Sequence, residues 1–451
     1  MKYFFLCLLL MLSVYDAAYA DNEPVEWNPP DSMLFKNWGF SPEEIAVIAG
    51  EDQIMINGKL NSVMLWTKKD NKPVEYKNAR IAYSATILDG SPEMIRQVIL
   101  NFSGKKPFKM IENLKILKKI NNHTMIQYEE QKSPIPFARK PQFIIQLTEF
   151  GANSIGSLLH EGDVGAAVMT FNFFKLTEKK TLLTMAAWSD TKSASFSYRI
   201  ILKAEPAFEQ VQTTMLMSAF IQEVKVAIAD LSEESIKKCG SNGAVDEKIK
   251  TPYFSLRKDL HMQSLLKLLK IGTVQFYHPP QKFNRGGEVV DFPEITTIRQ
   301  IFAPVNVVKP ILSDYSTQKK YHPFFVNYKN SVVKNKDYSI MKYGLHLGSF
   351  SLGAKARISE YWVNENIKEY RGEHKSDLEP LASCMEFISI PEDDSTLYVH
   401  TFGGVICDDA PFYLKFLRAL PSADLILSGG FSLLTADTGA DWMNIEIGNK
   451  K

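Results

Sequence analysis

The chain has no long apolar run beyond its first twenty residues and almost no net charge. Although 45% of its 451 residues are hydrophobic, no later segment reaches the roughly 18 consecutive apolar residues that a membrane-spanning helix needs. Lysine and arginine together number 52, and aspartate and glutamate 51. This balance offers a polyanion no electrostatic attraction, so we expect no nucleic-acid partner.

The motifs of common enzymes and metal sites are also missing. The sequence holds no G-x-S-x-G, no G-x-G-x-x-G that opens a helix, no Walker loop, no C-x-x-C and no H-x-x-x-H. His160 and Glu161 stand side by side, but adjacent strand residues point to opposite faces, so one metal rarely binds both. We therefore expect no metal and no cofactor.

One pair of ionisable residues keeps enzymatic chemistry open. His400 and Glu360 both lie in segments of the second half that we expect to be strands. Together in a cavity they would form an acid/base pair. They could equally face solvent or bind each other, and the sequence leaves these alternatives open.

Cysteine is scarce. Of the four cysteines, Cys7 lies in the leading apolar segment. The other three are an odd number, so at least one is unpaired in an oxidising compartment. Cys384 and Cys407 flank an expected hairpin that turns at residues 391–395. Either the two cysteines form a disulfide, which leaves Cys239 free, or they stay unpaired because, counted from the turn, they are a few residues out of register.

Residues 1–20 have the pattern of a signal peptide. Lys2 forms a short positive region, residues 3–14 are apolar, and Ala18-Tyr19-Ala20 is a cleavage site of the A-x-A type. We therefore expect an exported soluble protein, periplasmic or secreted, whose mature chain is long enough for two hydrophobic cores.

Residues 206–230 are expected to form one long amphipathic helix. Pro206 suits its first position, where the missing N–H costs nothing. Val211, Met215 and Phe220 belong to an apolar stripe that recurs every four residues or so. A helix of this length, following a run of strand-like segments, needs a sheet to lie on.

The start of this helix recurs 215 residues later, which indicates an internal duplication. Leu-Lys-Ala-Glu-Pro-Ala-Phe-Glu at 202–209 corresponds to Leu-Arg-Ala-Leu-Pro-Ser-Ala-Asp at 417–424. Further correspondences at offsets of 214 or 215 join Phe40-Ser41 to Phe254-Ser255, Gly58 to Gly272, Ile81 and Ile87 to Ile295 and Ile301, 125–128 to 340–343, and 182–187 to 397–402. We expect Gly58 and Gly272 to end the first helix of each half.

Each half has the same expected order of elements. A helix comes first (residues 42–57 and 257–271), followed by two strands, short helices, a meander of strands and a long last helix. This order predicts an α+β fold, an antiparallel sheet with its helices on one face. We expect two tandem domains, at residues 21–230 and 252–445, joined by a linker at 231–251.

Gly272-Thr273-Val274, followed by a strand that runs into a short amphipathic helix at residues 295–308, resembles a START-type domain. START-type domains belong to the helix-grip group, which includes polyketide cyclases and coenzyme Q-binding proteins. The resemblance covers nearly the whole mature chain but rests on element order and apolar pattern. It implies tandem helix-grip domains, each a curved antiparallel sheet wrapped on a long C-terminal helix. It also implies a tunnel between sheet and helix that holds a lipid, a sterol, an isoprenoid or a polyketide.

Large side chains of the strands and of the last helices are expected to line such cavities. They are Tyr128, Ile145, Trp188, Met215 and Phe220 in the first half, and Tyr343, Trp362, His400, Phe402 and Phe431 in the second. In the second half, Gly429-Gly430 either weakens the last helix or lets a ligand approach closely.

The absence of motifs favours a protein that binds or carries a hydrophobic small molecule or lipid, because burial of an apolar chain needs no catalytic group. A transient contact with a membrane stays open. One alternative is a cyclase- or hydratase-like enzyme of the same fold. Another is an interaction module in which one repeat has lost its cavity.

Overall fold

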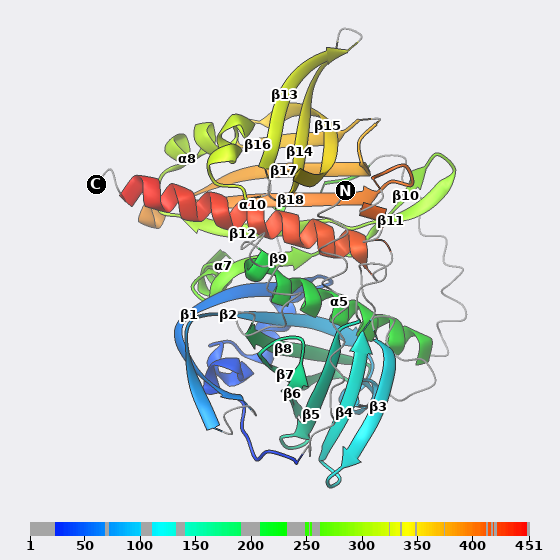
Figure 1. Ribbon diagram of the computed structural model, residues 1–451. Coiled ribbons are helices and arrows are strands. Elements are labelled where there is room, and N and C mark those ends of the chain that lie inside the picture. The colour runs from blue at the N-terminus through cyan, green and yellow to red at the C-terminus, as the bar shows by residue number, and fades with distance from the viewer. Residues whose placement is uncertain are drawn as a thin grey trace.

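One large antiparallel sheet carries the fold, and two long helices lie side by side across one of its faces (Figure 1). The computed structural model describes residues 23–67, 72–100, 111–131, 140–190, 208–231, 249–251, 253–254, 262–323, 325–333, 336–347, 350–373, 375–411, 414–415, 418 and 422–448. Among the helices of these residues, none is long and apolar enough to cross a membrane.

The first half starts with two short 3-10 helices, η1 (Asp31–Met33) and η2 (Phe35–Asn37), and continues into α2 (Pro42–Ala49). A capping box begins α2: the Ser41 hydroxyl accepts a hydrogen bond from the Glu44 N–H at 3.1 Å, and the Glu44 carboxylate accepts one from the Ser41 N–H at 2.7 Å. The elements that follow are β1 (Gln53–Thr67), β2 (Lys72–Asp89), α3 (Pro92–Leu100), β3 (Ile111–Lys119), β4 (Thr124–Gln131), β5 (Gln142–Glu149), β6 (Ser154–Gly162), β7 (Ala166–Thr177), β8 (Lys180–Asp190) and α5 (Phe208–Leu231).

The second half repeats this order and adds the hairpin of β10 (Gln281–Arg285) and β11 (Glu288–Phe292), which forms a small sheet of its own. Its other elements are α7 (Met262–Leu269), β9 (Gly272–Tyr277), β12 (Ile295–Ile301), α8 (Val305–Leu312), η4 (Tyr315–Lys320), β13 (Phe325–Val333), β14 (Lys336–Leu347), β15 (Phe350–Asn364), β16 (Ile367–Gly372), β17 (Leu378–Ile390), η5 (Pro391–Asp393), β18 (Ser395–Ile406) and α10 (Ala423–Gly448).

The order of the strands confirms the internal duplication. From the centre of the sheet outwards, the first half runs β1-β2-β8-β7-β6-β5-β4-β3 and the second half β9-β12-β18-β17-β16-β15-β14-β13. Each half is a strand pair, a meander and a long last helix, the order expected of a helix-grip domain. The described parts of the last helices, α5 from Phe208 and α10 from Ala423, are 215 residues apart, which is the offset that the sequence predicts. Pro206, Pro421, residues 1–20 and most of the expected linker lie outside the described residues.

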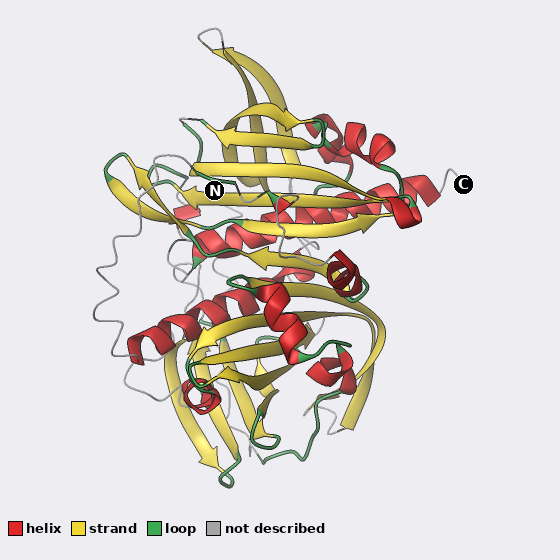
Figure 2. Ribbon diagram, turned by 180° about the vertical axis from the view of Figure 1, so that it is seen from behind, coloured by secondary structure: helices red, strands yellow, loops and turns green. Residues whose placement is uncertain are grey.

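The prediction of two separate sheets is wrong. β1 and β9 pair antiparallel, from Gln53 opposite Tyr277 to Gly58 opposite Gly272, so the sixteen strands form one sheet (Figure 2). Each half alone would leave the backbone groups of its first strand unpaired at an edge. Because each half contributes its first strand, the junction has an approximate two-fold symmetry.

The long helices repeat this symmetry above the junction. They run in opposite directions (Figure 1). An apolar contact joins them, made by Val211, Met215, Leu433 and Leu434. A Cβ on Gly430 would stand 2.9 Å from the Met215 Sδ, and one on Gly429 would overlap the Tyr277 hydroxyl. Because Gly429 and Gly430 have no side chains, Tyr277 and Met215 approach the helix closely at these positions. The close approach that the sequence offered to a ligand is thus made by side chains of the protein.

A buried carboxylate adds an ionic link between the halves. Asp437 of α10 is 5% exposed. It lies 3.3 Å from the Arg80 Nη1 of the first half and 3.3 Å from the Arg299 Nε of its own half. The Thr273 hydroxyl also donates a hydrogen bond to it at 2.5 Å. These contacts hold α10 to the two strand pairs on both sides of the junction.

The correspondence of Ile81 and Ile87 with Ile295 and Ile301 fails when the faces of the sheet are compared. Ile81 packs with Ile45 of α2, on the face away from the long helices, whereas Ile295 packs with Met217 of α5. Since successive strand residues point to opposite faces, Ile81 and Ile295 are not equivalent, and the true correspondence is shifted by an odd number of residues. Gly58 and Gly272 do not end helices either; Gly50, with a φ of 55°, ends α2.

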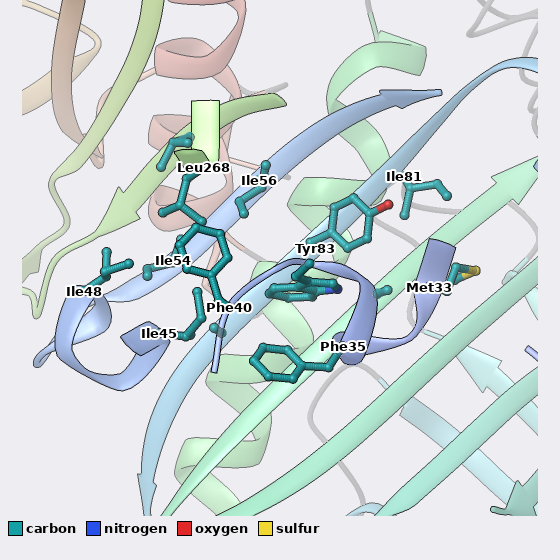
Figure 3. Close-up of a cluster of buried hydrophobic side chains, with 14 of the residues drawn as sticks. Met33, Phe35, Phe40, Ile45, Ile48, Ile54, Ile56, Ile81, Tyr83 and Leu268 are labelled. Carbon is teal, nitrogen blue, oxygen red and sulfur yellow. The ribbon is translucent and has the colours of Figure 1, made fainter. Parts of the chain in front are cut away.

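Apolar clusters cover both faces of the sheet. On the face away from the long helices, one cluster spans the two halves, because Leu268 of α7 packs with Ile45 and Ile48 of α2 and with Ile54 and Ile56 of β1 (Figure 3). On the other face, α5 and α10 each cover a cluster of their own.

Cys384 and Cys407 are both buried free thiols, so the disulfide alternative is wrong. Cys384 of β17 stands opposite Thr401 of β18, six residues before Cys407. At about 3.3 Å per strand residue this separation is roughly 20 Å, far beyond the reach of a disulfide. Cys239 lies outside the described residues.

Replacement of Gly429 by alanine should lower the free energy of unfolding by about 1–3 kcal/mol, because the new methyl group overlaps the Tyr277 hydroxyl. Urea unfolding measures this change. The double variant Gly429→Ala with Tyr277→Phe should recover part of the loss, since it removes the overlapping oxygen. A double variant no more stable than Gly429→Ala would contradict this account of the glycine.

Candidate functional site

The interior between the second half of the sheet and α10 brings four of the predicted residues together. His400 and Phe402 of β18 are two residues apart, so both point toward α10. The Phe431 ring of α10 lies between them and β14. Its centroid is 4.3 Å from that of Phe402, 4.7 Å from Tyr343 and 6.1 Å from His400.

His322 joins this aromatic cluster and was missed by the sequence analysis. Its ring centroid lies 5.1 Å from Tyr343 and 5.2 Å from Phe431, and its Nε2 lies 3.0 Å from the Thr435 Oγ1. It follows η4 in a turn without any apolar period. No sequence signal could therefore have placed it against α10.

Both histidines are held neutral by burial. His400 is 1% exposed and His322 is 4% exposed. Each ring has a pKa lowered to about 3, chiefly because burial removes the water around it; for His322 the charge that His400 would carry contributes as well. The His400 Nε2 lies 3.2 Å from the Ser383 Oγ, and its Nδ1 lies 3.3 Å from the Ser432 Oγ. His400 is thus a neutral ring fixed by two serines.

Four tyrosine hydroxyls lie in the same interior, those of Tyr321, Tyr343, Tyr370 and Tyr398. Burial raises the pKa of each above its ordinary value, and the phenolate charges would also repel one another. At neutral pH all four are therefore uncharged hydroxyl groups, which both donate and accept hydrogen bonds.

Three polar atoms of this interior have no hydrogen-bond partner among the described residues: the Tyr321 Oη, the Tyr398 Oη and the Gln318 Nε2. Neighbouring groups are paired, since the Tyr343 hydroxyl donates to the Gln318 Oε1 at 2.5 Å. A buried polar group without a partner costs about 1–3 kcal/mol, and folded proteins have few of them. Their grouping in one interior marks it as the candidate site.

The first-half residues of the predicted set do not form a comparable cluster. The Phe220 ring of α5 contacts the Phe171 ring of β7 in a tilted arrangement, with centroids 5.6 Å apart, and Ile145 packs against the same apolar cluster. Met215 lies at the contact between the two long helices. Whether these residues line a ligand cavity stays a prediction.

Three predicted residues point away from both interiors. Trp188 packs on the face opposite α5, against Tyr76 at 4.4 Å. Tyr128 is three residues from Met125, which packs under α5, so it also points to the opposite face. Trp362 is 46% exposed at the end of β15. Apolar character alone could not tell the two faces of a sheet apart when both are covered.

His400 and Glu360 do not form an acid/base pair. The Glu360 carboxylate lies 2.7 Å from the Lys368 Nζ and accepts a hydrogen bond from the Ser339 hydroxyl at 3.2 Å. Its side chain is 30% exposed. The two nitrogens of His400 are taken by Ser383 and Ser432, as described above. The sequence left this contact open, and the structure decides against it.

The first-half interior holds a buried carboxyl group instead of histidines. Glu129 of β4 is 7% exposed and accepts a hydrogen bond from the Gln127 amide at 2.7 Å. Burial raises the pKa of Glu129 to about 7. Glu129 is not among the residues predicted from the sequence, although its alternation with Met125 and Gln127 on β4 would place it on the face of α5.

His160, for which the sequence predicts no role as a metal ligand, pairs with a neighbouring side chain. The His160 Nε2 lies 3.0 Å from the Gln146 Oε1. Within the described part of the chain, no group of three or more histidine, cysteine, aspartate or glutamate side chains is arranged to hold a metal ion.

No protein-family model matches the chain, and no curated protein matches its sequence. Among solved structures, the di-domain ARO/CYC StfQ from the steffimycin biosynthetic pathway is similar at 10% identity, covering 81% of this chain and 99% of that one, with a TM-score of 0.27. A START superfamily protein from Mycobacterium smegmatis is similar at 16% identity, covering 34% and 99%, with a TM-score of 0.27. Human STARD10 is similar at 11% identity, covering 40% and 77%, with a TM-score of 0.27.

The resemblance to tandem START-type domains is confirmed at the level of fold. At such low scores the similarities to single structures carry no further argument, and the assignment rests on the duplicated order of strand pair, meander and long helix. The ligands and activities of those proteins are not transferred by it.

Acid should destabilise the protein through His322 and His400. Each has a pKa of about 3 when folded, against an ordinary value of 6.5. The unfolded chain therefore binds more protons between these values, and the free energy of unfolding falls as the pH drops through that window, by on the order of a few kcal/mol. Urea unfolding at several pH values tests this.

His400→Gln removes one titrating ring and keeps hydrogen-bonding capacity toward Ser383 and Ser432, so its stability should fall less steeply with acid. His123→Gln is the matched control, because the His123 side chain is 70% exposed. If all three proteins lost the same stability in acid, the buried histidines would not be the cause.

Proposed function

We propose that this protein binds and carries a hydrophobic small molecule, such as a lipid, a sterol or an isoprenoid, between the second half of the sheet and α10. One observation carries the proposal: unpartnered polar atoms of Tyr321, Tyr398 and Gln318 are grouped among aromatic rings. A ligand with an apolar body and one hydroxyl or carbonyl group would satisfy both the rings and these atoms.

The charge state of the interior supports a ligand with a neutral polar end. His322, His400 and the four tyrosines are uncharged at neutral pH. A charged head group would lose its hydration and find no counter-ion among these residues, which costs several kcal/mol. We therefore favour a hydroxyl or carbonyl group over a carboxylate or a phosphate.

Burial of the apolar body can supply the affinity. A chain of 16 carbons gains roughly 13 kcal/mol at about 0.8 kcal/mol for each CH₂ group. Association costs about 4–15 kcal/mol, so micromolar or tighter binding is reachable without any catalytic group. Phe431 touches several rings at once, and a ligand that enters must lie against this side chain or displace it.

The second candidate is an enzyme of the cyclase or hydratase kind in the same interior. The grouping of two imidazoles with four tyrosine hydroxyls favours it, because such groups transfer protons, although a pKa of about 3 makes each imidazole a weak base at neutral pH. His400 is the residue that separates the two functions. Its replacement would abolish turnover in an enzyme and change only affinity in a carrier.

We propose export as well, on the signal-peptide pattern of residues 1–20. Sequencing the N-terminus of the protein secreted or sent to the periplasm would test it. A mature chain that begins at Asp21 is the expected result, and an intact Met1 in the purified protein would contradict it.

Tyr398→Phe should weaken ligand uptake and leave the ligand-free protein at least as stable. The change removes a buried hydroxyl that has no partner, so its loss costs the apo protein nothing, while a bound ligand loses about 1 kcal/mol, or roughly fivefold in affinity. Native mass spectrometry of the purified protein first shows which lipids bind. Fluorescent sterol and fatty-acid titrations then compare the variants.

The matched control is Tyr370→Phe, whose hydroxyl already has a partner in the Met385 Sδ at 3.6 Å. It should lose some stability and keep its affinity. If Tyr398→Phe bound every probe as tightly as the unchanged protein, the unpartnered hydroxyl would play no part in recognition.

Phe431→Trp tests whether the interior has room for a ligand. A larger ring should take up space that the ligand needs, lowering lipid uptake with little change in melting temperature. In a filled core the same change would overpack the interior and cost about 1–3 kcal/mol. Phe220→Trp makes the same comparison in the first half. A lower melting temperature with unchanged lipid uptake would decide against a cavity at either position.

A further inference from the structure

Two stretches of the sequence have the acceptor pattern for N-linked glycosylation: asparagine, any residue except proline, and then serine or threonine. They are Asn101-Phe102-Ser103 and Asn122-His123-Thr124. The first lies outside the described residues, and the second belongs to the turn between β3 and β4. This turn takes no part in the proposed ligand interior.

The fold presents the second pattern at the tip of a hairpin. Residues 121–123 are all exposed, and Figure 1 shows the turn at the outer end of the first half. The Ile120 N–H donates to the Thr124 carbonyl at 3.0 Å and so closes the turn. A bulky, hydrated group on Asn122 can therefore extend into solvent without displacing any part of the fold.

The two adjacent asparagines of this turn have different surroundings. The Asn121 Oδ1 accepts a hydrogen bond from the His123 N–H at 2.7 Å, which holds the turn. Within the described part of the chain, no group bonds the Asn122 amide or the Thr124 hydroxyl. The side chain that the pattern marks as the acceptor is therefore the one that the fold does not use.

The turn also lies at an open edge of the sheet. β3 is the outermost strand of the first half and pairs on one side only, with β4. The backbone groups on its outer side can pair with a strand of another chain, as β1 and β9 pair within this one. Lys115 and Lys119 are exposed on β3 and oppose such pairing by their charge. A glycan at the end of the strand would oppose it by bulk and hydration.

We propose that Asn122 carries an N-linked glycan and that this glycan shields the open edge of β3. The inference rests on the proposed export, because the transfer takes place in a secretory pathway. In that transfer the Asn122 amide nitrogen forms a bond to the anomeric carbon of a lipid-linked oligosaccharide diphosphate. The bond from this carbon to the diphosphate oxygen breaks, the lipid diphosphate leaves, and the amide gives up one proton.

Expression of the full chain with its own leader in a secreting eukaryotic cell tests the proposal. The secreted protein is treated with peptide N-glycosidase in heavy-oxygen water and mapped by mass spectrometry. Labelled aspartate at position 122 is the expected result. Asn122→Gln and Thr124→Val should each lose this glycan completely. The matched controls Asn121→Asp, which keeps an acceptor for the His123 N–H, and Thr124→Ser should both retain it.

Loss of the glycan should leave the edge of β3 open to other chains. Light scattering during mild heating should therefore show several-fold faster aggregation of Asn122→Gln, and of the enzymatically deglycosylated protein, than of the glycosylated protein. Asn121→Asp should aggregate at the unchanged rate.

A secreted chain with an unmodified Asn122 would overturn the proposal and leave export standing. Retention in the cell with an intact Met1 would overturn export, and the glycan with it. Equal aggregation with and without the glycan would overturn the shielding of β3. If Thr124→Val is not secreted, Asn122→Gln still decides.

Discussion

The backbone pairing of β1 with β9 is the constraint on which the rest of the structure depends. Residues 53–58 and 272–277 exchange hydrogen bonds that neither half could satisfy alone, and this turns two sheets into one. Once the strands are joined, α5 and α10 must lie side by side on the same face. Gly430 meets Met215 of α5, and Asp437 reaches Arg80 of the first half, only because of that contact.

Successive side chains of each strand then lie on opposite faces of the sheet. On β18, Tyr398, His400 and Phe402 all point toward α10, while the residues between them point to the opposite face. Both faces are covered, one by the long helices and the other by α2, α7 and the N-terminal segment. An aromatic residue one position out of step, such as Trp188, is therefore equally well buried and belongs to a different cluster.

The two interiors share a fold and differ in chemistry. Glu129 of β4 and Tyr343 of β14, on equivalent strands, both point toward a long helix, yet one is a carboxyl group with a pKa of about 7 and the other a neutral hydroxyl. The second half collects histidines, tyrosines and unpartnered polar atoms around Phe431. A duplication that keeps the fold and changes the residues of each interior allows the two halves to have different functions.

The amino-acid sequence alone determined the duplication, the order of elements and the place of the last helices, because helical and strand periodicities and turn residues act over short distances. It also correctly predicted that Tyr343, His400, Phe402 and Phe431 face inward. Tertiary structure decided the single sheet, since the partner of an edge strand leaves no trace in that strand's own pattern. It also decided the face of Tyr128 and Trp188, the burial of Glu129 and the presence of His322, because these depend on residues that are far apart in the chain.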